Sequence, residues 1–295
     1  MATRNEIFEK INSTPPVWDT IRRDYIRQLS EYTGRDTILY SSAFPCKFQL
    51  PAPLSSVDLN DIQGFMTCFK GLKGNTLDII IHSPGGSLEA ADQIVQYLRN
   101  KYCHIRAIVP QNAMSAATMI ACACDEIVMG KQSAIGPIDP QMNINGTVIP
   151  AHSILSDFEK ARDEIANNPQ LSAVWGPKLM SIPHGYLDLC QKNIELSKSK
   201  VGEWLNNYMF KNSEKKGEEI ANWLGDFKEH KTHGRPIGYE ISKGHGINVI
   251  RLEDDQALQD LVLSVFHSTQ ITFDMTRCVK IIENHIGNGM YVTVN

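Results

Sequence analysis

Hydrophobic residues in the first half of the chain follow two alternating patterns. Continuous apolar runs rich in β-branched residues predict strands over residues 36–44, 76–83, 104–110 and 125–130. Helical spacing of apolar positions between these runs predicts helices over residues 57–72, 87–100 and 115–123. Strands that are apolar throughout and alternate with helices are typical of a mainly parallel sheet covered on both faces. The pattern therefore predicts an α/β fold.

The pattern changes after Pro150, where amphipathic helices dominate. They are predicted over residues 153–168, 185–210 and 217–227. A strand-like unit and then a helix are predicted over residues 247–253 and 255–272. Two helices before the first strand, separated by a pair of prolines, are predicted near residues 4–12 and 17–31.

The composition of the chain bears on its partners and its location. With 42% hydrophobic residues, 21% charged residues and a net charge of −4, the chain gives no reason to expect nucleic acid or an anionic membrane as a partner. No apolar run approaches the roughly 18 residues that span a bilayer, and the N-terminal residues lack the apolar centre of a signal peptide. We therefore expect a cytoplasmic protein without a membrane span.

The cysteines and histidines do not form ligand patterns. Seven cysteines, an odd number, fit reduced thiols better than a disulfide framework. Cys122 and Cys124 lie in the apolar run MIACACDEIVM, which favours burial as small hydrophobic residues over metal ligation. His245, His267 and His285 lack ligand-like spacing, so we expect no metal.

Two junctions between a strand and a helix carry candidate chemistry. In the first, Ser83-Pro84-Gly85-Gly86, glycine permits close backbone approach, so peptide N–H groups can face a ligand oxygen. In the second, Ser115 stands at the start of a helix, where serine is ordinarily a cap. Taken together, the two junctions predict a nucleophile, Ser115, and an oxyanion hole from Gly85 or Gly86 and Ala116.

The motifs around these junctions are similar to those of a known superfamily. The stretches IIIHSPGGSLEAADQI, AMSAATMIACACDEIVMG and SAIGPIDPQ, which lie within residues 76–141, resemble the Clp-protease and signal-peptide-peptidase superfamily in order and spacing. The Gly-Pro-Ile-Asp-Pro-Gln stretch at 136–141 resembles most closely the branch called serine dehydrogenase (or dehydratase) proteinase. A looser resemblance extends over residues 185–285.

This resemblance implies both a fold and an activity. It implies a Clp/crotonase-like spiral of ββα units, with the oxyanion hole at Gly85, Gly86 and Ala116. It also implies a serine peptidase that acts on peptides or proteins without a cofactor and assembles into a homo-oligomer, trimer-based or a larger ring. We accordingly expect an N-terminal helical segment over 1–35 and a protease domain over 36–295, mostly helical from 145 to 230.

The general base is not evident from the motifs. A serine hydroxyl needs a base at neutral pH, and the histidine of the Clp branch is replaced here by Ile138-Asp139. The signal-peptide-peptidase branch uses a lysine instead, and Lys160 lies at a comparable distance, 45 residues after Ser115. Lys178 and Lys192 fit less well because long lysines on amphipathic helices are usually solvated.

His233 is the other candidate base, in the stretch EHKTHGRPIG. It falls near the place where the Clp branch supplies its acidic residue, and Asp226 or Asp139 could orient it. Its alternative is a structural role in the turn. Arg235 either binds a substrate carboxylate or pairs with an acid.

Two other functions stay open at this stage. An acyl-CoA enzyme of the crotonase type would use paired N–H groups to hold a thioester enolate, although no basic cluster suits the phosphates of CoA. A non-catalytic scaffold or partner-binding protein would explain the missing Clp-type histidine. Neither alternative needs a nucleophile at Ser115.

Overall fold

The computed structural model describes residues 7, 18–47, 51–144, 146–211, 213 and 215–294. The helix predicted near 17–31 is confirmed as α2 (Trp18–Thr33). The helix predicted near 4–12 lies outside the described residues apart from residue 7.

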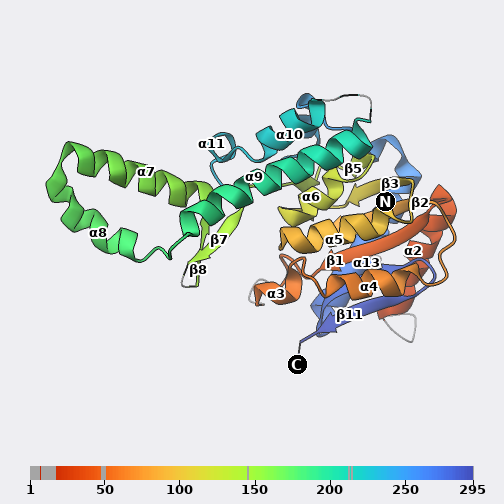
Figure 1. Cartoon of the computed structure of the whole chain (residues 1–295). Helices are drawn as coiled ribbons and strands as arrows, with labels where there is room; N and C mark the ends of the chain where they lie inside the picture. Colours follow the sequence, from red (N-terminus) through yellow and green to blue (C-terminus); the bar gives the residue numbers. More distant parts are fainter. Residues whose placement is uncertain are drawn as a thin grey trace.

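A seven-stranded sheet forms the centre of the described part of the chain, in the order β11-β10-β1-β2-β3-β5-β9 (Figure 1). The parallel strands are β1 (Asp36–Ser42), β2 (Thr76–His82), β3 (His104–Val109), β5 (Glu126–Met129) and β9 (Val249–Arg251). The antiparallel strands at one edge are β10 (Cys278–Asn284) and β11 (Gly289–Thr293). The predicted α/β class with a mainly parallel sheet is confirmed.

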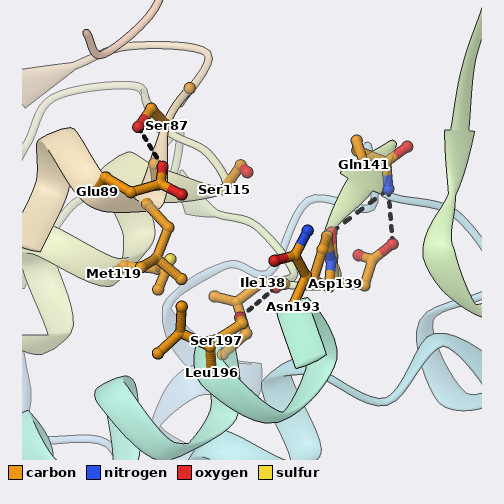
Figure 2. A pocket seen from close by; sticks show the side chains of 14 residues that line it. Ser87, Glu89, Ser115, Met119, Ile138, Asp139, Gln141, Asn193, Leu196 and Ser197 are labelled. Atoms are coloured by element: carbon orange, nitrogen blue, oxygen red, sulfur yellow. Dashed lines mark hydrogen bonds between the residues drawn. The ribbon is translucent and has the colours of Figure 1, made fainter. Parts of the chain in front are cut away.

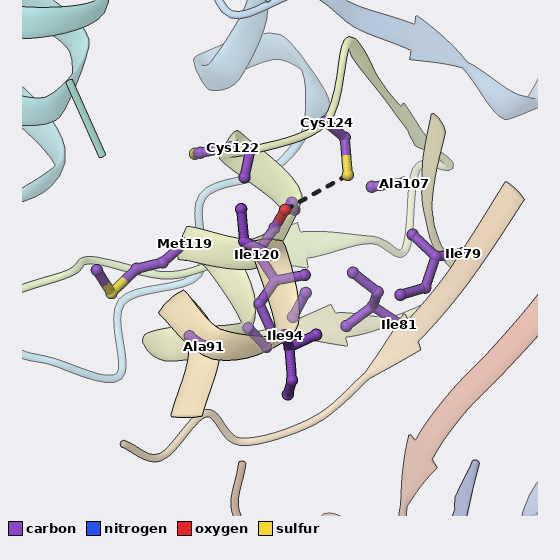
Figure 3. Packing of buried hydrophobic residues seen from close by; sticks show 14 of the residues in the cluster. Ile79, Ile81, Ala91, Ile94, Ala107, Met119, Ile120, Cys122 and Cys124 are labelled. Carbon is purple, nitrogen blue, oxygen red and sulfur yellow. Dashed lines mark hydrogen bonds between the residues drawn. The ribbon is translucent and has the colours of Figure 1, made fainter. Parts of the chain in front are cut away.

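Helices cover both faces of this sheet because successive strand residues point to opposite sides. Ile79 and Ile81 belong to a buried cluster that includes residues of three helices, α4 (Asp61–Phe69), α5 (Leu88–Arg99) and α6 (Ala116–Cys122) (Figure 3). Ile80, between them, packs instead with residues of α2 and α13 (Gln256–Met275). This double coverage explains why β2 is apolar throughout.

A helical arm projects from the sheet (Figure 1). It comprises β7 (Gln141–Ile144), β8 (Thr147–Pro150), α7 (Ala151–Asn167), α8 (Ser172–Met180) and the start of α9 (Tyr186–Trp204). The arm has a small apolar cluster of its own. Helix α9 returns to the body and packs on α10 (Lys216–Leu224), so one helix connects the arm to the sheet.

Short elements complete the described part of the chain. They are α3 (Ala52–Ser55), β4 (Asn112–Ala113), β6 (Ala134–Ile135), η1 (Pro169–Leu171), the π-helical turn η2 (Leu205–Met209), α11 (Phe227–His230), α12 (Tyr239–Gly244) and η3 (Leu252–Asp254). None of the described helices is long and apolar enough to cross a bilayer.

Strand β10 was not predicted, and its polar residues explain why. Lys280, Glu283 and Asn284 interrupt its apolar pattern, yet all three are buried. Each has a partner elsewhere in the chain: Lys280 pairs with Asp61, Glu283 with Arg22, and Asn284 donates to a backbone carbonyl. Such partners lie more than 200 positions away in sequence, so a local pattern cannot reveal them.

The two cysteines of the apolar run behave as predicted. Cys122 and Cys124 are buried in the main apolar cluster (Figure 3), and burial raises the pKa of both thiols to about 12. They are therefore neutral packing residues. The proposed domain division at residue 35 stays a prediction; α2, which precedes it, packs against α13.

His82 makes the free energy of unfolding depend on pH. Its side chain is fully buried, Nδ1 accepts from the Asn112 N–H at 3.3 Å, and Nε2 bonds the Phe44 carbonyl. Burial lowers the pKa of His82 to about 4, from an ordinary value of about 6.5. As pH falls from 6.5 to 4, the unfolded chain binds the proton first, so we expect a loss of about 3 kcal/mol of unfolding free energy.

Urea unfolding of wild type and His82→Gln at pH 7, 5.5 and 4 measures this dependence. The variant should be less stable at pH 7 but should lose less stability on acidification, because it lacks the titrating group. Equal slopes in the two proteins would contradict the prediction.

Candidate active site

Backbone hydrogen bonds join the two predicted junctions. The Ser83 N–H donates to the Asn112 carbonyl and the Met114 N–H donates to the Ser83 carbonyl, each at 3.0 Å. These bonds continue the pairing of β2 beyond its end and hold the Ser83–Gly86 turn beside the residue that starts α6. Ser115 and the glycine turn are therefore neighbours, as the sequence suggested.

Ser115 has an unusual backbone conformation. Its φ is 52° and its ψ is −120°, a region that non-glycine residues rarely occupy. Such conformations cost about 1–3 kcal/mol and cluster at functional sites. The Ser115 side chain makes no capping hydrogen bond to α6, so the ordinary role of a helix-initiating serine is not seen. A strained turn from strand to helix that presents a serine hydroxyl to a cavity is the arrangement of a nucleophile elbow, and Ser115 is half-buried at such a turn.

Two glycines permit the turn to lie close to Met114 and Ser115 on one side and to Val57 on the other. At Gly85, with φ of 94°, a Cβ would lie 2.4 Å from the Met114 carbonyl oxygen and 2.6 Å from the Ser115 Cβ. At Gly86, with φ of 156°, a Cβ would lie 2.3 Å from the Val57 carbonyl oxygen. None of these three distances is tolerable for real atoms, so both positions require glycine.

The peptide unit between these glycines is held through its carbonyl. The Val57 N–H donates to the Gly85 carbonyl at 2.8 Å. Because a trans peptide points its N–H away from its C=O, the Gly86 N–H faces away from Val57. The backbone N–H groups of Gly86 and Ala116 donate to no acceptor among the described residues, whereas Gly85 N–H donates to Ser83 Oγ at 3.2 Å.

Ser115, Gly86 and Ala116 line a cavity of about 200 Å³ (Figure 2). Its other lining residues come from the start of α5, from α6, from the 138–141 segment and from α9: Ser87, Leu88, Glu89, Met119, Ile138, Asp139, Pro140, Gln141, Asn193, Leu196 and Ser197. The lining thus has apolar side chains and two carboxylates but, in the described part of the chain, no lysine or histidine.

Asp139 connects this cavity to His233. The Asp139 carboxylate is buried, one oxygen bonds His233 Nδ1 at 2.8 Å, and the other accepts from Gln141 Nε2 at 2.8 Å. His233 is 25% exposed and is not among the lining residues. Of the two candidate partners of His233, Asp139 is the one that bonds it. Asp226 instead caps α11 by accepting from the Lys228 and Glu229 N–H groups.

The other predicted side chains lie away from the cavity. Lys160 is 63% exposed on α7, 3.9 Å from Glu164. Arg235 donates to the Glu229 carbonyl at 2.8 Å and lies 3.8 Å from the Glu229 carboxylate, which agrees with its pairing alternative. Exposed ion pairs also hold Lys178 and Lys192. The catalytic roles of Lys160 and His233 stay predictions.

Sequence reasoning missed the contribution of α9 to the site. Asn193, Leu196 and Ser197 line the cavity, and Ser197 Oγ donates to the Ile138 carbonyl at 2.7 Å. The only local signal is polar residues within an apolar helix face. That signal does not say which segment the helix contacts.

Comparison with known proteins identifies the family of the chain. The sequence profile described as ClpP-like SDH-type serine proteinase matches residues 57–259. The chain belongs to this family of ClpP-like serine proteinases, which confirms the resemblance noted in the sequence.

Individual relatives are more distant. Two uncharacterized proteins of Methanocaldococcus jannaschii, MJ0137 and MJ1495, are 32% and 31% identical over 60% and 59% of this chain. The matches cover 54% and 51% of those proteins, so the chain spans about half the length of the curated relatives it matches. A solved serine-to-alanine mutant of the 1510-N membrane-bound stomatin-specific protease has a TM-score of 0.41 and 18% identity, over 70% of this chain and 79% of that chain.

Gly85→Ala tests the steric requirement of the turn. We expect it to lower the free energy of unfolding by at least about 2 kcal/mol, because the new Cβ meets Met114 and the positive φ is strained. Urea unfolding measures the change. Gly176→Ala is the matched control, since a Cβ there meets nothing within 4 Å, and it should be neutral or slightly stabilising. Equal effects at the two positions would contradict this account of the turn.

Proposed function

We propose that this chain is a serine peptidase that cleaves peptide bonds through an acyl-enzyme on Ser115. One observation carries the proposal. Ser115 has a strained backbone, and its hydroxyl makes no capping bond to α6. Beside it, the N–H groups of Gly86 and Ala116 donate to no acceptor among the described residues. Membership of the serine proteinase family supports the same conclusion. The oxyanion hole then consists of the Gly86 and Ala116 N–H groups, with Gly85 shaping the turn.

The reaction follows from this arrangement. Ser115 Oγ attacks the substrate carbonyl carbon, and the electron pair of the C=O bond moves to the oxygen, where the two N–H groups stabilise the negative charge. The base takes the hydroxyl proton and passes it to the departing amine as the C–N bond breaks. Water then attacks the acyl-enzyme, and the same base accepts its proton and returns one to Ser115.

We propose His233 as the base, with Asp139 orienting its ring. His233 is bonded to a carboxylate that lines the cavity, whereas Lys160 lies on the exposed face of the arm. His233 bonds Asp139 but does not line the cavity, so the proposal requires its ring to turn toward the cavity when substrate binds. Catalytic hydrogen bonds often tighten only in the complex with substrate.

The substrate and assembly belong to the same proposal. Met119, Ile138 and Leu196 give the cavity apolar walls, which suit an uncharged side chain of a peptide. We propose a cytoplasmic, cofactor-independent homo-oligomer, as the family resemblance implies. The absence of a lysine or histidine from the described lining favours one alternative, a non-catalytic scaffold, and the labelling experiments below separate the two.

A fluorophosphonate probe tests the nucleophile. The probe phosphonylates an activated serine, so we expect it to label wild type and not Ser115→Ala, as measured by fluorescence and intact mass. Ser181→Ala is the matched control, because Ser181 is an exposed serine on the arm whose hydroxyl only caps a turn, and it should label normally. Labelling that survives Ser115→Ala would contradict the proposed nucleophile, and an unlabelled wild type would favour the scaffold.

The same probe distinguishes the two candidate bases. His233→Gln should lower the labelling rate by about 100-fold, because removal of a general base typically costs at least this much. Lys160→Met should label at the wild-type rate. A loss confined to Lys160→Met would instead identify the lysine of the arm as the base.

A further inference from the structure

Lys280 is a buried lysine for which the proposed reaction has no direct use. It lies on β10 with only 2% of its side chain exposed. Its ammonium group donates to the Ser56 carbonyl at 2.6 Å and to the Asp61 carboxylate at 2.7 Å, and lies 3.4 Å from the Asp58 carboxylate. All of its polar contacts therefore go to one short segment, residues 56–61.

Asp61 completes this cluster from the start of α4. Its other carboxylate oxygen accepts from the Tyr40 hydroxyl and from the Asp58 N–H, the latter at 3.0 Å. The side chains of Tyr40 and Asp61 are both about 1% exposed. A buried, fully bonded charge pair is costly to desolvate and adds little net stability, but it fixes its partners in direction and distance.

The cluster holds Val57 from both sides. Lys280 binds the carbonyl of Ser56, the residue before Val57, and Asp61 binds the N–H of Asp58, the residue after it. Val57 in turn donates its N–H to the Gly85 carbonyl at 2.8 Å and accepts from the Ser87 N–H at 2.9 Å. These two bonds lie on either side of Gly86.

We infer that Lys280 and Asp61 are positioning residues that aim the Gly86 N–H at the oxyanion. The inference rests on the proposed function, because it assigns a purpose to the Gly86 N–H. The Gly85–Gly86 peptide unit is held through its carbonyl by Val57, and Val57 is held by the buried pair. A displaced Val57 would rotate this peptide plane and turn the N–H away from Ser115, while the lining side chains of α6, α9 and the 138–141 segment stay in place.

Lys280→Met removes the amine and keeps an apolar chain of similar length. Saturation kinetics with the fluorophosphonate probe should show the maximal labelling rate of Ser115 falling by about 10- to 100-fold, the scale expected for a misplaced catalytic group. The concentration of probe at half-saturation should stay unchanged, because probe binding does not depend on the Gly86 N–H.

Two variants separate positioning from general loss of stability. Lys280→Met alone leaves the Asp61 carboxylate buried without its partner, and adding Asp61→Asn removes that charge. The double variant should therefore fold more readily than Lys280→Met. It should still label as slowly, because the Ser56 carbonyl has lost its donor in both. Lys101→Met is the matched control: Lys101 also donates to a backbone carbonyl, that of Leu72, but it precedes β3 at the opposite end of the parallel strands. It should label at the wild-type rate.

Hydrogen exchange gives a readout that does not need activity. Amides in the peptide that covers residues 83–88 should exchange faster in both Lys280 variants and not in Lys101→Met. Unchanged exchange there, or wild-type labelling by the folded double variant, would overturn the inference. An unlabelled wild type would overturn the proposed function alone, since exchange would still report whether Lys280 holds the turn.

Discussion

The Met114 N–H donates to the Ser83 carbonyl, and the Ser83 N–H donates to the Asn112 carbonyl. These two hydrogen bonds bring the Ser83–Gly86 turn into contact with the turn that ends at Ser115. Ordinary side chains would prevent such an approach, because a Cβ at Gly85 would overlap both the Met114 carbonyl and the Ser115 side chain. The glycine turn and the strained serine are therefore one unit. This backbone contact places the Ser115 side chain beside the glycine turn.

The core makes that contact rigid. Strand β2 is buried on both faces, with Ile79 and Ile81 packed against one layer of helices and Ile80 against the other. Thr118 adds a polar link within the same layer, since its hydroxyl donates to the Ala113 carbonyl and accepts from the Gly136 N–H. Strain at Ser115 can persist because these surroundings leave the junction no alternative conformation.

The cavity lies where the arm joins the body. Helix α9 supplies three lining residues, and its Ser197 hydroxyl holds the Ile138 carbonyl, next to the carboxylate that bonds His233. The same helix continues into the arm and packs against α7. Part of the wall of the cavity therefore belongs to the helix that carries the arm, whereas the buried Lys280–Asp61 pair contacts the segment that bonds the glycine turn.

The sequence alone determined the parallel strands, the glycine turn and Ser115, because each depends on local patterns: continuous apolar runs, and glycine or serine at a strand end. It also limited the partners of His233 to two acids. Only the tertiary structure decided between Asp139 and Asp226, placed α9 over the cavity and revealed β10. These features depend on contacts between distant residues, and Lys280 shows the reason, since its buried ammonium group pairs with Asp61, 219 positions away in sequence.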